Sequence, residues 1–187
     1  MSGRRRDRRP GGTAAEALPW GDTGLWDFSL AVYARPRVAN TCLMLQDRFG
    51  ADANLILYGC WLGVTGRGAL TAEDLAQLSE AATVWHKEVV VPLRGVRQWL
   101  KSPPRRVARA LAEALRAQVK AAELDAERIE QTVLGEALNR SPVAHERERR
   151  RRDVAQSLDA YFAFIGAALD DPARDATAAL IDEVCTR

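Results

Sequence analysis

The stretch Leu25-Trp26-Asp27-Phe28-Ser29-Leu30 opens a run of helix-spaced apolar residues that decides the fold class. It predicts a helix over 25–34, a second over 36–49 and a third over 53–64, each bounded by proline, glycine or a capping residue. Asp52 is placed to cap the third helix. That helix is apolar on nearly every side, which is typical of a helix at the centre of a bundle.

The rest of the chain continues the helical pattern, and no alternating strand pattern of useful length interrupts it. Thr71 and Asp74 resemble a capping box and predict the start of a fourth helix. Pro92 predicts a kink or a fresh start, followed by a helix to Lys101. Further helices are expected over 143–169 and 171–184. Together these segments predict an all-α, single-domain bundle of seven or eight helices.

The longest predicted helix begins at Ser102-Pro103, read as an N-cap with proline in the first helical position. It carries the most regular apolar stripe in the protein, whose members step by three or four residues and are expected to face the core: Val107, Leu111, Leu115, Val119, Ala122, Ala126, Ile129 and Val133. Four tryptophans also lie on apolar helix faces and are predicted to anchor the core: Trp26, Trp61, Trp85 and Trp99.

Charge separates the chain into a tail and a body. Residues 1–22 are rich in arginine and glycine without apolar periodicity, so we expect a disordered basic tail followed by one helical domain over 23–187. The tail region holds the net charge of +2, and the body has equal numbers of acidic and basic residues. A balanced body is not expected to bind nucleic acid specifically or to be drawn to a membrane. The three widely spaced cysteines are expected to be free thiols of a cytoplasmic protein.

Two charged helix faces are candidate interaction sites. Arg94, Arg97 and Lys101 share one face, and Glu123, Glu127 and Glu130 share another at the same helical spacing. They could form the walls of a charged groove. The interpretation that we favour leaves them solvated, or paired across neighbouring helices as exposed ion pairs that contribute about 0–1 kcal/mol each.

Motifs for catalysis, cofactors or metals are not recognisable in the sequence. There is no Gly-rich phosphate loop and no nucleophile motif. Neither His86 nor His145 has the glutamate three residues earlier that a di-metal helical bundle would require. The acidic segment at Asp170 reads as a helix start, and we expect no metal site and no cofactor. Asn54, inside the most apolar helix, needs polar partners if it is buried.

Several segments, in order and at the expected spacing, resemble one small family of uncharacterised, all-helical proteobacterial proteins that is catalogued as a domain of unknown function. The segments are LWDFSL (25–30), LQD (45–47), GADANL (50–55), WLG (61–63), VVPLRGVR (90–97) and KAAELDAERIE (120–130). The resemblance covers about residues 24–135. It implies a soluble bacterial protein and supplies no catalytic residues.

Two hypotheses about function follow. The favoured one is a non-enzymatic helical protein that binds an unknown protein partner, or a second copy of itself through a long helix. The alternative is an enzyme or small-ligand binder with a polar pocket inside the bundle. The candidate residues for a pocket or interaction site are Trp26, Asp27, Asn54, Trp85, His86, Arg94, Glu123 and Glu127.

Overall fold

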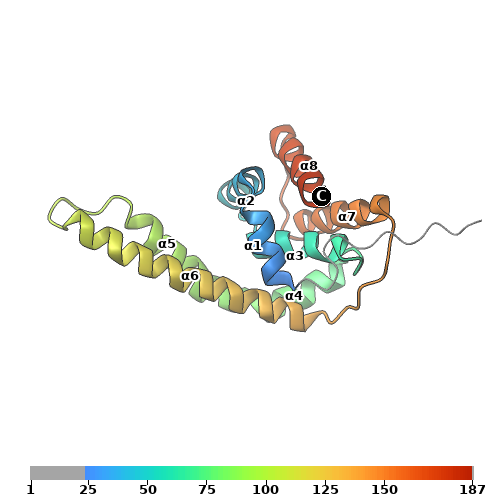
Figure 1. Cartoon of the computed structure of the whole chain (residues 1–187), viewed down its shortest axis with the longest axis horizontal. Helices are drawn as coiled ribbons and strands as arrows, with labels where there is room; N and C mark the ends of the chain where they lie inside the picture. Colours follow the sequence, from blue (N-terminus) through green and yellow to red (C-terminus); the bar gives the residue numbers. More distant parts are fainter. Residues whose placement is uncertain (1–23, 187) are drawn as a thin grey trace, which may run out of the picture.

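The computed structural model describes residues 24–186, and every regular element in that part of the chain is helical (Figure 1). The predicted all-α fold is therefore confirmed. The prediction for residues 1–22 lies outside the described residues. The elements are α1 (Leu25–Tyr33), α2 (Pro36–Phe49), α3 (Ala53–Val64), α4 (Ala72–Trp85), the π-helical segment η1 (His86–Val90), α5 (Val91–Trp99), α6 (Arg109–Ala137), α7 (Arg147–Phe164) and α8 (Asp171–Cys185).

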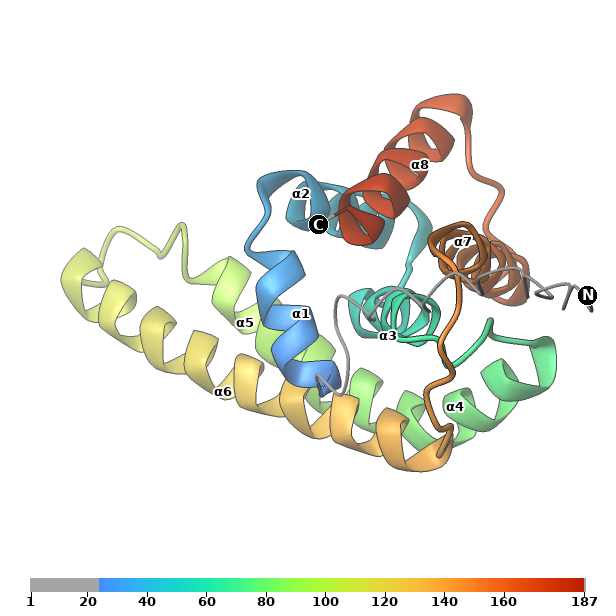
Figure 2. The same cartoon turned by 45° about the vertical axis from the view of Figure 1, so that its right-hand side comes forward.

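Helix α3 lies at the centre, where it contacts α1, α2, α6, α7 and α8 (Figure 2). All but one of its residues are buried, as expected for a helix that is apolar on every side. Two glycines allow α7 to approach closely. A Cβ on Gly63 would lie 2.6 Å from the backbone nitrogen of Val154, and one on Gly59 would lie 3.1 Å from Ser157 Cβ. Side chains at these positions would force the two helices apart.

The local signals at helix ends mostly behave as predicted. Asp52 accepts a hydrogen bond from the backbone N–H of Asn54 at 2.8 Å and caps α3. Thr71 and Asp74 form a complete capping box at the start of α4. Gly50 ends α2 in the left-handed conformation, with φ of 66°. These signals need only neighbouring residues, so the sequence contains all the information that they require.

The start of the longest helix was predicted wrongly. Helix α6 begins at Arg109, not at Pro103. Pro104 explains why Pro103 is not helical, because a residue that precedes proline is driven out of the helical region. The helix predicted over 143–169 is also shorter, since α7 begins at Arg147. Residue Val143 instead donates its backbone N–H to the carbonyl of Gly66 at 2.9 Å, which ties this connection to the end of α3.

Helix α5, the connection over 100–108 and the first half of α6 project from the helical body as a two-helix arm (Figure 1). We call residues 91–122 the arm. The predicted burial of the α6 stripe is wrong here: Val107, Leu111 and Leu115 are 45%, 72% and 48% exposed. Trp99, at the end of α5, is 61% exposed and does not anchor the core. Regular apolar spacing predicts a helix face that another element should cover. In the arm, no element among the described residues packs on this face.

Candidate functional site

A buried cluster of two carboxyl groups and an imidazole lies where α3, η1 and α6 meet. The Nδ1 atom of His86 is 3.0 Å from Glu130 Oε1 and 3.2 Å from Asp52 Oδ2. The Glu130 side chain is fully buried, and the side chains of Asp52 and His86 are 11% and 18% exposed. We call Asp52, His86 and Glu130 the acid–histidine cluster. Buried charged groups of this kind persist only when each has a partner.

Asn54 and its neighbours hold the carboxyl groups of the cluster in place. The Asn54 side chain donates to Glu130 Oε2 at 2.7 Å, while its backbone N–H donates to Asp52 Oδ1. The side-chain oxygen of Asn54, Oδ1, accepts a hydrogen bond from Gln131 Nε2 at 2.9 Å. Tyr161 on α7 accepts a hydrogen bond from the backbone N–H of Asp52 at 2.6 Å. The partners that the sequence analysis required for a buried Asn54 are therefore present.

The three groups of the cluster shift one another's pKa. Burial and the charge of Glu130 raise the pKa of Asp52 to about 8, so this carboxyl is largely protonated at neutral pH. Burial also acts to raise the pKa of Glu130, but hydrogen bonds from His86 and Asp52 outweigh it and lower that pKa. Burial lowers the pKa of His86, and the two carboxyl groups more than reverse this effect. The pKa values of the two carboxyl groups therefore move in opposite directions, although both groups contact the same imidazole.

The π-helical segment η1 sets the position of His86, its first residue. Pro92 follows this segment and lacks a backbone N–H, and in an α-helix its ring would clash with the carbonyl of Glu88. A π-turn admits one extra residue and carries the chain through without a break. Such turns occur frequently at functional sites. The sequence predicted a kink near Pro92, but it did not predict that the π-turn would direct the His86 side chain toward Glu130 on α6.

The two charged faces meet along the seam between α5 and α6. Arg94 pairs with Glu123 at 3.3 Å and with Glu127 at 2.8 Å, and Arg97 also pairs with Glu123. Pairing across neighbouring helices was predicted correctly, but the prediction that the pairs are exposed was wrong. Glu123 is only 5% exposed, and the Arg94 side chain is 11% exposed. Buried pairs of this kind fix the register of α5 on α6, because either charge alone would be costly to bury.

The remaining candidate residues are not brought into a common pocket. Trp26 packs against α6, with the Arg128 guanidinium 5.8 Å from its ring centre. Trp85 is half-buried and donates its indole N–H to the carbonyl of Ala126 at 3.0 Å. Asp27 is exposed on α1. An open groove of about 520 Å³ lies elsewhere, between α2 and α8.

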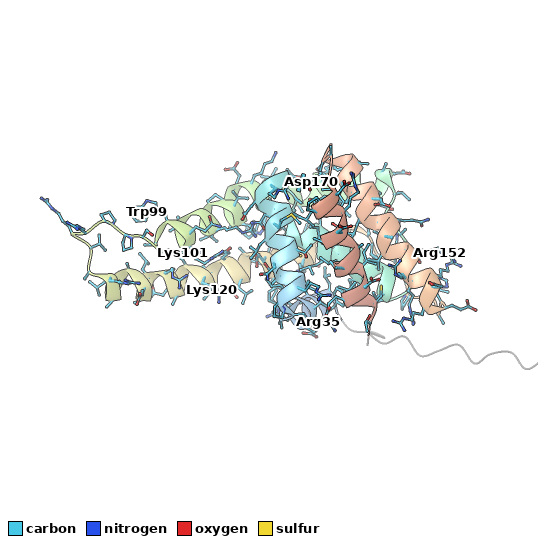
Figure 3. All side chains as sticks on the ribbon, turned by 90° about the horizontal axis from the view of Figure 1, so that it is seen from above. Arg35, Trp99, Lys101, Lys120, Arg152 and Asp170 are labelled. Atoms are coloured by element: carbon cyan, nitrogen blue, oxygen red, sulfur yellow. The ribbon has the colours of Figure 1, made fainter. Side chains whose placement is uncertain are left out.

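The far end of the arm combines exposed apolar side chains with positive charge. Figure 3 shows Trp99, Lys101 and Lys120 along it, away from the body. Over residues 99–120 one acidic residue, Glu113, stands against six basic ones: Lys101, Arg105, Arg106, Arg109, Arg116 and Lys120. A hollow of about 120 Å³ between the connection over 100–108 and the start of α6 is lined by residues that include Lys101, Arg109 and Arg116. Because the body as a whole has equal numbers of acidic and basic residues, its net charge did not reveal this local excess of positive charge.

Sequence reasoning missed two members of the acid–histidine cluster as site residues. Asp52 was recognised only as a helix cap, and Glu130 only as part of a charged face. The three residues are far apart in sequence and share no motif, so no spacing rule could have joined them. The signal that could have pointed to Glu130 is the helical periodicity of α6, because Glu123, Ala126 and Glu130 all lie on its buried face.

Comparisons with known proteins identify a family but no activity. No helix in the described part of the chain is both long and apolar enough to cross a membrane. Neither the comparison with curated proteins nor that with solved structures found a match. The family model described as a protein of unknown function, DUF2390, matches residues 24–134 and so spans α1 to α5 and most of α6. The chain belongs to this family of proteins of unknown function.

Proposed function

We propose that this protein is a non-enzymatic binding protein whose arm docks an acidic, amphipathic helix of a partner protein. The observation that carries the proposal is the row of exposed apolar residues at the start of α6, Leu111 and Leu115 with Val107 just before the helix, flanked by basic side chains. An amphipathic helix typically binds through side chains at this spacing. Trp99, also exposed near the end of the arm, offers the kind of aromatic side chain that often dominates binding energy.

The positive charge of the arm favours an acidic protein segment over a second copy of the arm. Two arms packed in parallel would bring Arg105, Arg106 and Arg109 of each copy together, and like charges oppose such pairing. The row on α6 is also narrow, which suits a helix better than a membrane surface, into which a broad apolar face must insert. The ion pairs of Arg94 and Arg97 hold the arm rigid before binding, which reduces the entropy that binding loses.

The alternative, a ligand pocket inside the bundle, has less support. Its proposed polar residues bond to one another: Asn54 and His86 bond to Glu130, and Arg94 bonds to Glu123. Groups that satisfy each other offer little to an incoming organic molecule. We also propose a cytoplasmic location, which the three free cysteines support because thiols stay reduced there.

The test is quantitative capture from a lysate of the native host on immobilised wild-type protein and on a double variant, Leu111→Glu with Leu115→Glu. Both positions are exposed, so the double variant should keep its fold and stability. A matched control is Val84→Glu on α4, which is 71% exposed and lies outside the arm. We expect one specific protein to be lost with the arm variant and retained with the control, and its binding segment to be acidic.

Three results would contradict the proposal. Equal capture by the wild type and the arm variant would remove the arm from the binding site. Binding of the arm to phosphatidylglycerol vesicles, with no protein captured, would assign it to a membrane surface instead. Self-association that the arm variant abolishes, measured by light scattering on the purified chain, would replace the acidic partner with a second copy.

A further inference from the structure

The acid–histidine cluster has the donor set and the geometry of a metal site. Its ligand-type atoms, one imidazole nitrogen and two carboxylate oxygens, all lie within 4.8 Å of one another. They come from three separate parts of the chain: the N-cap of α3, the first residue of η1 and the C-terminal third of α6. Imidazole nitrogen and carboxylate oxygen are both ligands that Zn²⁺ accepts in proteins.

Two of the three distances between ligand atoms are slightly shorter than those around a tetrahedral ion. With ligand atoms at about 2.0–2.1 Å from Zn²⁺, two ligands of a tetrahedron lie about 3.3–3.4 Å apart. His86 Nδ1 lies 3.0 Å from Glu130 Oε1 and 3.2 Å from Asp52 Oδ2, close to that value. A small outward movement of these side chains would admit the ion. Three protein ligands leave a fourth position for water.

The second oxygen of each carboxyl group is already held by Asn54. Its backbone N–H binds Asp52 Oδ1, and its side-chain amide binds Glu130 Oε2, so Oδ2 and Oε1 are left facing His86. Metal sites use such supporting hydrogen bonds to orient their ligands, and losing one typically weakens binding 10- to 100-fold. Gln131, which supports Asn54, keeps a buried Oε1 with no hydrogen-bond partner among the described residues.

Charge also favours a divalent cation at this place. Two carboxylates and a neutral imidazole carry a charge of −2, and burial makes that charge unfavourable unless protons or a cation neutralise it. A divalent ion bound here would leave the buried site neutral.

We propose that Asp52, His86 and Glu130 bind one divalent transition-metal ion, with Zn²⁺ the best match, in a site preorganised by Asn54. This site lies in the body and is independent of the docking surface on the arm. It revises the expectation from sequence that no metal site exists, because that expectation relied on ligand spacing along the chain.

The experiment is a titration of the full-length, chelator-treated protein with Zn²⁺, followed by calorimetry, and with Co²⁺, followed by its visible absorption. The wild type should bind one equivalent, and His86→Gln and Glu130→Gln should lose at least 100-fold in affinity. Asn54→Ala should lose about 10- to 100-fold. Two matched controls, His145→Gln and Cys185→Ser, alter other potential metal ligands and should bind like the wild type.

A measurement on the wild type keeps the test valid if a variant fails to fold. The chain has two histidines, so ¹⁵N-histidine spectra should show the Nδ1 resonance of His86 moving on addition of Zn²⁺ while His145 stays unchanged. A folded wild type that binds no Zn²⁺ and no Co²⁺ would overturn the proposal and leave the cluster with a structural role. Binding that survives in His86→Gln, or a shift of His145 alone, would overturn it as well.

Discussion

Substituting Gly63 by alanine should destabilise the protein through the contact between α3 and α7. The new Cβ would lie 2.6 Å from the Val154 backbone nitrogen and 3.0 Å from its Cα. Backbone atoms cannot move away by changing rotamer, so the two helices must separate along their interface. Overpacking of this kind costs about 1–3 kcal/mol, and a rigid backbone contact belongs at the upper end. Alanine regains about 1 kcal/mol of helix propensity. We therefore expect a net loss of about 2 kcal/mol in the free energy of unfolding.

The matched control is Gly135→Ala in α6, where nothing lies within 4 Å of the new Cβ. There the propensity gain is unopposed, and the free energy of unfolding should rise by about 0.5–1 kcal/mol. Urea denaturation of both variants measures the two changes, and thermal melts should move in opposite directions by a few degrees. If Gly63→Ala is as stable as the wild type, or if both variants shift alike, the close packing of α3 on α7 is refuted.

Three further outcomes are expected. Glu123→Ala leaves Arg97 without its ion-pair partner and should reduce the free energy of unfolding by about 2–3 kcal/mol. Glu113→Ala, in an exposed pair, should change it by less than about 0.5 kcal/mol. Equal urea midpoints for the two variants would refute the buried ion pairs between α5 and α6. Burial acts to raise the pKa of Asp74, but hydrogen bonds from Thr71 outweigh it and lower that pKa. This capping stability is therefore present above the unfolded pKa of Asp74 and is lost as pH falls through its lower folded pKa, and Asp74→Asn should remove that part of the acid dependence in urea titrations. Burial raises the pKa of Cys42 to about 12, so this thiol should not react with a thiol reagent at pH 8 until the protein unfolds, and prompt labelling would contradict its burial.

Much of the fold could be predicted because it depends on local patterns. Three features each depend on a few adjacent residues: the apolar composition of α3, the N-caps at Asp52 and Thr71, and the C-terminal stop at Gly50. The start of α6 failed for a local reason that was overlooked: Pro103 precedes another proline. The burial of Leu111 was predicted wrongly for a non-local reason. Periodicity shows that a helix face is apolar, but it does not show which element covers that face.

The candidate site could be predicted only in part. Arg94, Glu123 and Glu127 were found because like charges recur at helical spacing, and their pairing follows from two adjacent antiparallel helices. Asp52 and Glu130 were not assigned to a site with His86, because packing of three distant elements brings them together. The basic arm was missed because its excess charge is offset by acidic residues elsewhere, and a sum over the chain does not show where charges gather.

The most direct test of the docking claim is site-specific photo-crosslinking in the native host. A photoreactive phenylalanine analogue replaces Leu111 on the arm in one strain and Val84 on α4 in another, both exposed positions. The account predicts that position 111 crosslinks to one protein through a helical segment rich in Asp and Glu, and that raising the salt concentration of a lysate weakens the capture. Crosslinks to lipid, to a basic segment, or to the same proteins from positions 84 and 111 would contradict it.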